Sequence, residues 1–123
     1  MQEILKSLQA TFNDSDSVCF FVYPNFRIKL FNEKAASNSL VLHGKEIHEG
    51  DSILDFARDT KNRIDGKFIT CFGRAVSGQQ VKQKQQIHYN SVVLDTVSTY
   101  TPVRKSDEVV GVSIVVSIEK PRS

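Results

Sequence analysis

Cysteine is scarce in this 123-residue sequence, where only Cys19 and Cys71 occur, and tryptophan is absent. Two cysteines far apart in apolar runs exclude the dense disulfide framework of a small secreted domain and zinc sites built on Cys-x-x-Cys pairs. The sequence also lacks any run approaching the roughly 18 consecutive apolar residues of a membrane span. Residues 1–15 lack the unbroken apolar core of a secretion signal. We therefore expect a cytoplasmic protein with reduced cysteines and no membrane span.

A large charge of one sign is lacking as well. The 16 Lys and Arg residues are interspersed with 14 Asp and Glu residues, so the formal net charge is only +2. Such a balance creates no long-range field that would attract nucleic acid or an anionic lipid surface. A chain of this length buries about two thirds of its unfolded surface when it folds. Composition therefore predicts one globular domain whose partners are neither nucleic acids nor membranes.

What the sequence does contain first is an amphipathic stretch. In QEILKSLQATF the apolar residues Ile4, Leu5, Leu8 and Phe12 recur at helical spacing and share one stripe. The polar run NDSDS that follows ends this helix. The predicted organisation is an amphipathic helix over residues 1–13 and a globular domain over residues 14–120. Because an isolated helix of this length is marginal in water, it needs a surface that buries its stripe.

An alternating strand turns directly into a helix at Asn32. VCFFVY is an apolar strand, and PNF turns the chain back into RIKLF, whose residues alternate between polar and apolar. Asn followed by Glu, Lys, Ala and Ala is typical of a helix start, so Asn32 is the predicted cap of a short helix that ends near Leu40. Asp51 is the predicted cap of a second short helix, SILDFA.

A longer helix and three strands complete the chain. NRIDGKFITCFGRAVSG has apolar residues at helical spacing and is closed by Gly78. The residues on this apolar stripe are Ile64, Phe68, Phe72 and Ala75. The strands that follow are predicted at about residues 80–88, 92–103 and 108–118.

This order of elements predicts an α+β fold. Five strands can form one antiparallel sheet, with the helical middle of the chain crossing from the second strand to the third and covering one face only. The other face would keep apolar residues such as Val97 and Val112 or Val116. The N-terminal helix is the candidate to cover that face, in its own chain or in a partner's.

Three stretches, in this order and spacing, resemble the PAS domain, the small sensory module of signalling proteins: RIKLFNEKAA, GKEIHEGDSILDF and TPVRKSDEVVGVSIVV. The resemblance implies a PAS-like sheet with helices on one face, a ligand cavity walled by those helices, and a place in a signalling protein such as a bacterial sensor histidine kinase. It also implies a homodimer formed through the N-terminal helix and the outer sheet face. The sequence departs from the family at Phe26, where a turn glycine is common, and at SIEKPRS, which replaces the usual Asp-Ile-Thr ending.

The predicted ligand pocket lies between the sheet and the longer helix. Alternation in LDTVSTYTP places Thr96, Ser98 and Tyr100 on the inner face and Asp95 outward. The pocket residues expected from all elements together are Phe20, Val22, Phe68, Phe72, Thr96, Ser98 and Tyr100. An apolar cavity with a few hydroxyls suits a small, mostly apolar ligand with one polar end. In the alternative, the hydroxyls bond to each other or to the backbone and the cavity is collapsed.

Cofactor chemistry finds no supporting motif. Cys71 lacks the Asn-Cys-Arg-Phe-Leu-Gln stretch of flavin-binding PAS domains, and His43 and His48 lie outside the helix that carries the ligand in haem-binding members. His88 is expected to be a solvated residue at a strand end, and no metal-site spacing occurs. Haem, flavin and metal are therefore disfavoured, and the sequence does not identify the ligand.

Two other classes of protein stay open. An isomerase-like or dehydratase-like enzyme with a cone-shaped α+β fold would use Asp55 or Asp95 as a general base, although such folds place long helices before most of their strands. A ligand-free interaction module would fill its own cavity with Phe20, Phe68 and Phe72. The order of elements favours the sensor, which itself carries out no catalysis.

Overall fold

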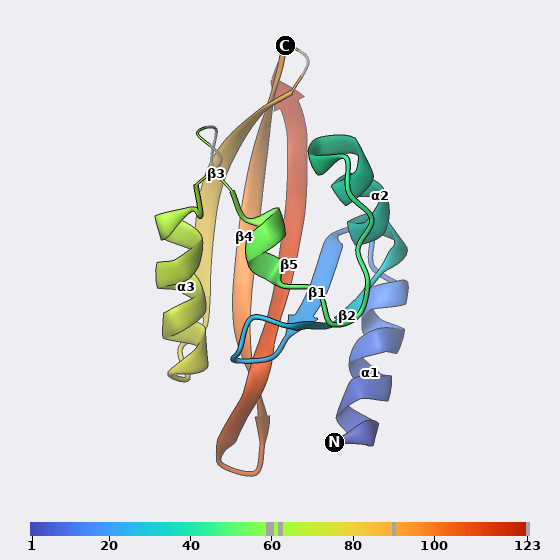
Figure 1. Cartoon of the computed structure of the whole chain (residues 1–123), viewed down its shortest axis with the longest axis vertical. Helices are drawn as coiled ribbons and strands as arrows, with labels where there is room; N and C mark the ends of the chain where they lie inside the picture. The colour runs from blue at the N-terminus through green and yellow to red at the C-terminus, as the bar shows by residue number, and fades with distance from the viewer. Residues whose placement is uncertain (59–60, 62, 90, 123) are drawn as a thin grey trace.

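The structure is a computed structural model that describes residues 1–58, 61, 63–89 and 91–122. Within these residues the elements in chain order are α1 (Gln2–Asn13), β1 (Val18–Val22), β2 (Ile28–Phe31), α2 (Glu33–His43), the 3-10 helix η1 (Ile53–Phe56), α3 (Gly66–Val76), β3 (Val81–Tyr89), β4 (Val92–Lys105) and β5 (Glu108–Arg122). The strands form one antiparallel sheet in the order β2-β1-β5-β4-β3 (Figure 1). The predicted α+β class and five-stranded antiparallel sheet are confirmed.

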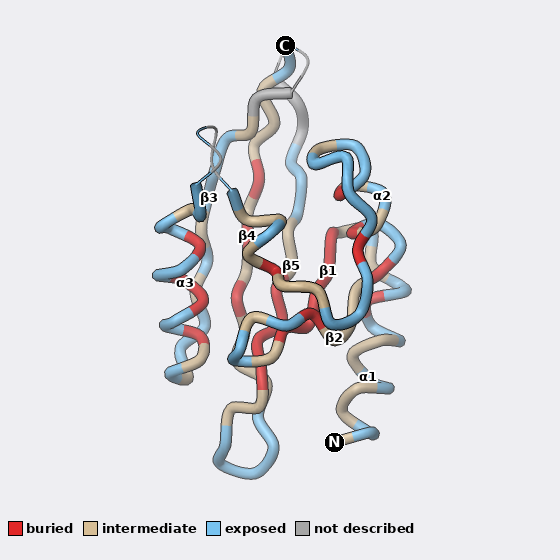
Figure 2. The backbone as a smooth tube through the Cα atoms, viewed as in Figure 1, coloured by how far each residue is buried: buried red, intermediate tan, exposed pale blue. Residues whose placement is uncertain are grey.

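The sheet carries helices on both of its faces. On the inner face, α3 lies over the β3 and β4 side, α2 lies toward β1 and β2, and η1 lies between them (Figure 1). On the outer face, α1 packs against β1 and β2. Buried backbone in Figure 2 is concentrated on β1, on the middle of β4 and β5, and on the side of α3 that faces the sheet.

Strand β1 is buried on both sides because its residues alternate between two hydrophobic clusters. Val18, Phe20 and Val22 belong to a cluster beneath α2, η1 and α3, which we call the inner cluster. Cys19 and Phe21 belong to a second cluster beneath α1, which we call the outer cluster. A strand covered on both faces reads as a continuous apolar run, and VCFFV is such a run.

The outer cluster confirms the predicted N-terminal amphipathic helix and shows where its stripe is buried. Phe12 is 2% exposed and packs with Cys19 and Phe21, while Leu5 and Leu8 are partly buried against them. Each large apolar side chain that is fully buried contributes about 1.5–3 kcal/mol before conformational entropy is subtracted. Docking of α1 on its own sheet is therefore energetically accessible without a partner.

The assignment of Val112 or Val116 to the outer face was wrong. Both valines pack in or against the inner cluster, because they pair across the ladder with Val22 and Val18, which face inward. The apolar residues that β5 contributes to the outer cluster are instead Val110 and Val115. A shift of one residue in a strand moves a side chain to the opposite face.

The corner at Asn32 is built as the sequence predicted, with additional long-range bonds. Its side-chain oxygen accepts a hydrogen bond from the Ala35 backbone N–H at 2.9 Å and caps α2. The same oxygen accepts from the Cys19 N–H at 3.2 Å, and the amide nitrogen donates to the carbonyls of Phe12 at 2.9 Å and Ser17 at 2.8 Å. Asn32 thus joins the end of α1, the start of β1 and the start of α2.

The turn between β1 and β2 has Phe26 where a glycine is common in PAS domains. Phe26 has a φ of 71°, in the left-handed region that favours glycine. Its N–H donates to the Tyr23 carbonyl at 2.9 Å, and its ring stacks on Phe72 at 4.9 Å between centroids. The stacking contact offsets the cost of this backbone conformation and ties the turn to α3.

Several predicted boundaries need correction. Helix α2 ends at His43 rather than near Leu40. The longer helix begins at Gly66 rather than before Ile64, because the Asp65 side chain caps it by accepting from the Lys67 N–H at 2.9 Å. Ser52, not Asp51, caps η1, and the Asp51 carboxylate instead accepts from the His48 N–H at 2.9 Å. Strand β5 continues beyond its predicted end at about residue 118, to Arg122.

Candidate functional site: the inner cluster

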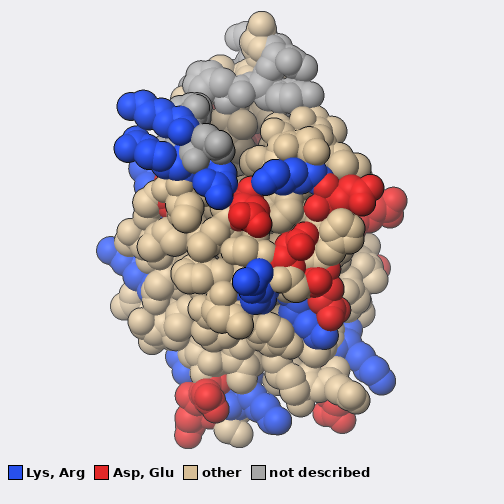
Figure 3. Space-filling model, in the orientation of Figure 1, with Lys and Arg blue, Asp and Glu red and all other residues tan. Residues whose placement is uncertain are grey.

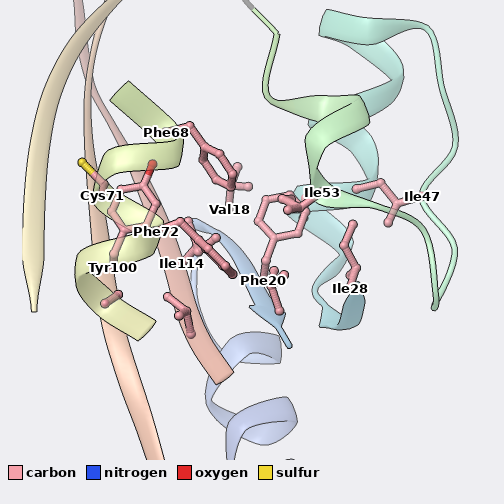
Figure 4. Packing of buried hydrophobic residues seen from close by; sticks show 14 residues of the cluster. Val18, Phe20, Ile28, Ile47, Ile53, Phe68, Cys71, Phe72, Tyr100 and Ile114 are labelled. Atoms are coloured by element: carbon pink, nitrogen blue, oxygen red, sulfur yellow. The ribbon is translucent and has the colours of Figure 1, made fainter. Parts of the chain in front are cut away.

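The structure places all seven predicted pocket residues on the inner side of the sheet. Each of them is at most 9% exposed. They are Phe20 and Val22 in β1, Phe68 and Phe72 in α3, and Thr96, Ser98 and Tyr100 in β4. The alternation argument thus located the inner residues of β4, and Figure 4 shows the rings of α3, β1 and β4 facing one another.

Aromatic rings form a continuous layer through this site. Phe72 lies 5.7 Å from Phe68 between ring centroids, and Phe68 lies 5.9 Å from Tyr100. With the stacked Phe26 on the other side of Phe72, the layer runs from the β1–β2 turn across α3 to β4. Such rings offer a large apolar surface with preferred stacked or tilted contacts.

The three predicted hydroxyls differ in how they are used. The Thr96 hydroxyl donates to the Gln85 backbone carbonyl at 3.2 Å. Among the described residues, the hydroxyls of Ser98 and Tyr100 make no hydrogen bond, although these residues are only 8% and 3% exposed. Their oxygens keep some contact with solvent, because the buried side-chain atoms without a partner in the described chain are Ser39 Oγ and Gln83 Nε2. The Thr96 hydroxyl is thus bonded to the backbone, as in the collapsed alternative, whereas the hydroxyls of Ser98 and Tyr100 make no such bond among the described residues.

Burial also sets the protonation state of Tyr100. Loss of solvent raises the pKa of the Tyr100 hydroxyl well above its usual value, and the nearby Cys71 and Asp65 raise it further. Burial likewise raises the pKa of the Cys71 thiol, with Arg74 acting in the opposite direction. Both groups are therefore protonated and uncharged near neutral pH.

Gln83 is a site residue that the sequence reasoning missed. It lies in β3 directly opposite Ser98 in the ladder, and its side-chain oxygen accepts a weak hydrogen bond from the Cys71 thiol at 3.7 Å. Its side-chain nitrogen is buried and has no hydrogen-bond partner within the part of the chain that the structure describes. The alternation of Val81 and Gln83 with the exposed Lys82 and Lys84 is the signal that could have placed it on the inner face.

Two open surface hollows lie away from the inner cluster's polar groups. One, of about 460 Å³, runs along the start of β1 and the end of β5, and the other, of about 540 Å³, lies between the end of α1 and the start of α2. Asp16 and Lys34 line both hollows. Neither hollow is lined by any of the seven predicted pocket residues, so these residues pack against one another rather than around either hollow.

Comparison with solved structures shows which fold this arrangement is. The crystal structure of the phage VqmA–DPO complex matches with a TM-score of 0.73 and 18% identity, covering 95% of this chain and 53% of that one. This chain thus spans about half the length of that protein. The PAS domain of BvgS from Bordetella pertussis matches with a TM-score of 0.63 and 9% identity over 94% of this chain and 85% of that one. A PAS domain from Colwellia psychrerythraea matches with a TM-score of 0.60 and 18% identity over 94% and 97%.

The chain has the PAS fold. The likeness is structural, because no protein-family model and no curated protein matches the sequence. At identities of 9–18% the agreement concerns the backbone arrangement and not the residues of the site. Among its described helices, none is long and apolar enough to cross a membrane.

The carboxylates considered for an enzyme lie outside the inner cluster. Asp55 is exposed on η1 and lies 3.7 Å from the Arg58 guanidinium. Asp95 lies on the opposite side of β4 from its neighbour Thr96, as predicted, and pairs with Gln86 in the ladder. Neither carboxylate is therefore placed to act as a general base on a molecule in the inner cluster.

The histidines of the chain do not gather at one place among the described residues. His43, the last residue of α2, is exposed as a whole, although one side of its ring is covered edge-on by Phe56 at 6.1 Å between centroids. Burial, with a smaller contribution from Lys45, lowers the pKa of His43, so its ring is neutral near pH 7. His48 is exposed between Glu46 and Asp51, and the side chain of His88 lies outside the described residues. The described residues contain no group of three or more His, Cys, Asp or Glu side chains that could hold a metal ion.

Proposed function

We propose that this PAS domain is a sensory module of a signalling protein and that a small, mostly apolar ligand with one polar end binds in the inner cluster. The observation that carries the proposal is the buried Gln83 side-chain nitrogen, which has no partner in the described chain and lies beside the unbonded hydroxyls of Ser98 and Tyr100 and the aromatic rings. Buried polar groups in native proteins nearly always have a hydrogen-bond partner. A ligand with a polar end would supply that partner.

Similarity of fold adds support to this proposal. The phage VqmA protein was crystallised as a complex with DPO, and it matches this chain over nearly the whole domain. The PAS resemblance of the sequence implies the same role, within a receptor such as a histidine kinase. That parent protein is part of the proposal and rests on the resemblance alone.

Binding would act on the position of α3. Phe68 and Phe72 contact each other and reach across to Tyr100, so a molecule between α3 and β4 has to separate some of these rings. Because protein interiors are close-packed, displaced rings move the helix that carries them. A ligand that binds only the displaced arrangement shifts the population toward it, which is how occupancy becomes a signal.

The ligand proposal is tested by asking what the domain holds. Native mass spectrometry and absorbance of freshly purified protein detect a molecule that co-purifies. NMR titration with acetophenone, an apolar probe with one polar end, should shift the amide resonances of Phe72 and Tyr100. The Ser98→Ile variant, which fills the site from β4, should weaken this response, whereas Val97→Ile on the opposite side of β4 is the matched control. A protein that carries no small molecule and does not respond to acetophenone contradicts the proposal and favours a ligand-free interaction module.

Homodimerisation is a second part of the proposal. In the single chain α1 covers β1 and β2. On the outer side of β4, which β5 separates from β1, Val97 and Thr99 are only partly buried. A second copy could cover this strip and α1 together. Size-exclusion chromatography with light scattering should show a dimer for the intact chain and a monomer for a chain that begins at Asn13. If both are monomers at high micromolar concentration, the dimer is wrong and α1 serves only its own domain.

A further inference from the structure

We propose that the polar end of the ligand is a neutral hydrogen-bond acceptor, such as a carbonyl oxygen, and that the side-chain amide of Gln83 donates to it. This inference rests on the proposed function, because it specifies the chemistry of the ligand that the inner cluster binds. It makes Gln83 of β3, absent from the residues expected from the sequence, the residue that selects among apolar molecules of similar shape.

The first observation is the unused donor itself. The Gln83 side-chain nitrogen is inaccessible to solvent and has no partner in the described chain. A primary amide has two N–H donors, so this group enters the interior with both donors unsatisfied. Leaving a buried donor unpaired costs free energy that an apolar residue of similar size would avoid.

The second observation is the orientation of the amide. The Cys71 thiol of α3 donates to the Gln83 oxygen at 3.7 Å. Because burial raises the pKa of this thiol, it remains a donor and keeps the oxygen of the amide on its side. The NH₂ group is thereby directed away from Cys71.

The third observation is the position of Gln83 beside the unpaired hydroxyls. In the β3–β4 ladder Gln83 pairs with Ser98, and the next inward pair along the strands is Val81 with Tyr100. Tyr100 belongs to the inner cluster, and its side chain rises from β4 toward α3 in Figure 4. The amide of Gln83 and the hydroxyls of Ser98 and Tyr100 therefore occupy neighbouring positions on one face of the sheet.

The environment restricts the acceptor to a neutral group. No buried side chain in the described part of the chain carries a charge near neutral pH. The buried polar residues are Asn, Ser and Thr, which do not ionise, and burial keeps Tyr100 and the two cysteines protonated. Figure 3 shows Lys, Arg, Asp and Glu side chains on the surface of the helical face, both across its middle and at its edges. A carboxylate or phosphate in the inner cluster would lose its hydration without a buried counter-charge, because Arg74, the cation that acts on the neighbouring Cys71, is exposed on α3.

Two probes of equal shape test this chemistry. Acetophenone and α-methylstyrene differ only in that a carbonyl oxygen replaces a CH₂ group, so only acetophenone can accept a hydrogen bond. For the wild-type domain we expect acetophenone to bind about tenfold more tightly, the effect of one hydrogen bond to an otherwise unpaired donor. Dissociation constants come from NMR titrations of the full chain, and the side-chain NH₂ resonances of Gln83 should shift with acetophenone alone.

Matched variants assign the preference to Gln83. In Gln83→Met, which keeps the length of the side chain and removes the amide, acetophenone should bind as weakly as α-methylstyrene, whose own affinity should not change. Gln86→Met is the control, because Gln86 is exposed, points to the other side of β3 and pairs with Asp95. The control should keep the wild-type ratio.

The possible outcomes separate this inference from the proposed function. If the wild-type domain binds both probes equally, a bound water serves Gln83 and the inference is overturned, while the ligand site itself stands. If neither probe binds, the ligand site of the proposed function is contradicted. The wild-type ratio and the Gln83 resonances remain decisive should the Met variant fail to fold.

Discussion

Two side-chain amides of this domain, Asn32 at the corner between β2 and α2 and Gln83 in β3, are used in opposite ways. Asn32 is 3% exposed, and its two donors and its oxygen make four hydrogen bonds within 3.2 Å. Gln83 has only a weak contact from the Cys71 thiol and a buried nitrogen with no partner in the described chain. A fully bonded amide holds segments of the fold together, whereas a buried amide with free donors leaves an interaction for something else to complete.

The same contrast extends to the clusters around the two amides. Near Asn32, the outer cluster is closed by α1, with Phe12 and Phe21 almost fully buried. In the inner cluster, the hydroxyls of Ser98 and Tyr100 stay unpaired beneath α3. The bonded amide at the outer cluster stabilises the fold, whereas under the function proposed above the unpaired amide at the inner cluster serves a ligand. Substitutions of the two amides should therefore have effects of different sign.

The largest effect is expected from Asn32→Ala. The substitution removes the cap of α2 and the acceptor of the Cys19 N–H, and it takes one hydrogen bond from each of the Phe12 and Ser17 carbonyls. We expect the free energy of unfolding to fall by about 3–5 kcal/mol, since a helix cap and several buried hydrogen bonds are lost together. Chemical denaturation measured by circular dichroism gives the value.

The control for this prediction is Asn25→Ala. The Asn25 side chain accepts one exposed hydrogen bond, from the Arg27 N–H at 3.1 Å. Its loss should cost less than about 1 kcal/mol. If Asn32→Ala costs no more than this control, the four bonds at the corner do not hold the segments together and the comparison fails.

Gly111→Ala should have the next largest effect and examines how tightly the sheet packs around Phe21. A Cβ atom at Gly111 would lie 2.6 Å from the Phe21 ring and 2.8 Å from the Val22 carbonyl oxygen. Neither group can move freely, because Phe21 is fully buried and the carbonyl belongs to the backbone. We expect a loss of about 2–3 kcal/mol from overpacking.

Gly73→Ala provides the opposite result from the same chemical change. Gly73 lies inside α3, and a Cβ atom there meets nothing within 4 Å. Replacing glycine by alanine in a helix interior stabilises by about 0.5–1 kcal/mol. Equal thermal midpoints for the two variants would mean that the packing around Gly111 is looser than the structure has it.

Local sequence patterns predicted the helices and strands. The hydrogen bonds between segments far apart in the chain could be found only in the structure. The run from Asn32 to Ala36 predicted a helix cap, because a cap depends on residues three positions away. The bonds from Asn32 to Phe12 and Ser17 could not be predicted, since they join segments 15–20 residues apart. The helix start at Gly66 was missed because Ile64 fits the apolar spacing, although Asp65 is the residue that caps.

In the candidate site, too, local patterns predicted the direction of side chains and only the structure showed their hydrogen-bond partners. Strand alternation placed Thr96, Ser98 and Tyr100 inward, because side-chain direction in a strand is a local property. Whether each hydroxyl finds a partner depends on β3, and only the structure places the Gln85 carbonyl next to Thr96. Gln83 was overlooked because a glutamine in a strand rich in lysine and glutamine resembles a solvated residue.

A stabilising effect is expected from Gln83→Met in the ligand-free domain. The substitution replaces a buried amide with free donors by an apolar side chain of the same length. We expect the free energy of unfolding to rise by about 1 kcal/mol, opposite in sign to the effect at Asn32. Denaturation of Gln83→Met and of Gln86→Met, which should change by less than about 0.5 kcal/mol, checks this. A clear loss of stability in Gln83→Met would place Gln83 with Asn32 as a structural amide.

The smallest effect is expected for Tyr100→Phe and is visible only at alkaline pH. Because burial raises the pKa of Tyr100 in the folded state, its proton is held after an unfolded tyrosine, with a pKa near 10, has begun to lose its own. Folding is therefore penalised as the pH rises above about 10, since the unfolded chain then binds fewer protons than the folded one. Removing the hydroxyl removes this penalty, so Tyr100→Phe should lose less stability than the wild type between pH 7 and about pH 10.5, by somewhat under 1 kcal/mol.

Urea denaturation of both proteins at the two pH values measures the difference, and other titrating groups cancel because both proteins carry them. An identical loss in both proteins would mean that Tyr100 ionises as freely in the folded domain as in the unfolded chain, so that the inner cluster admits solvent to its hydroxyl.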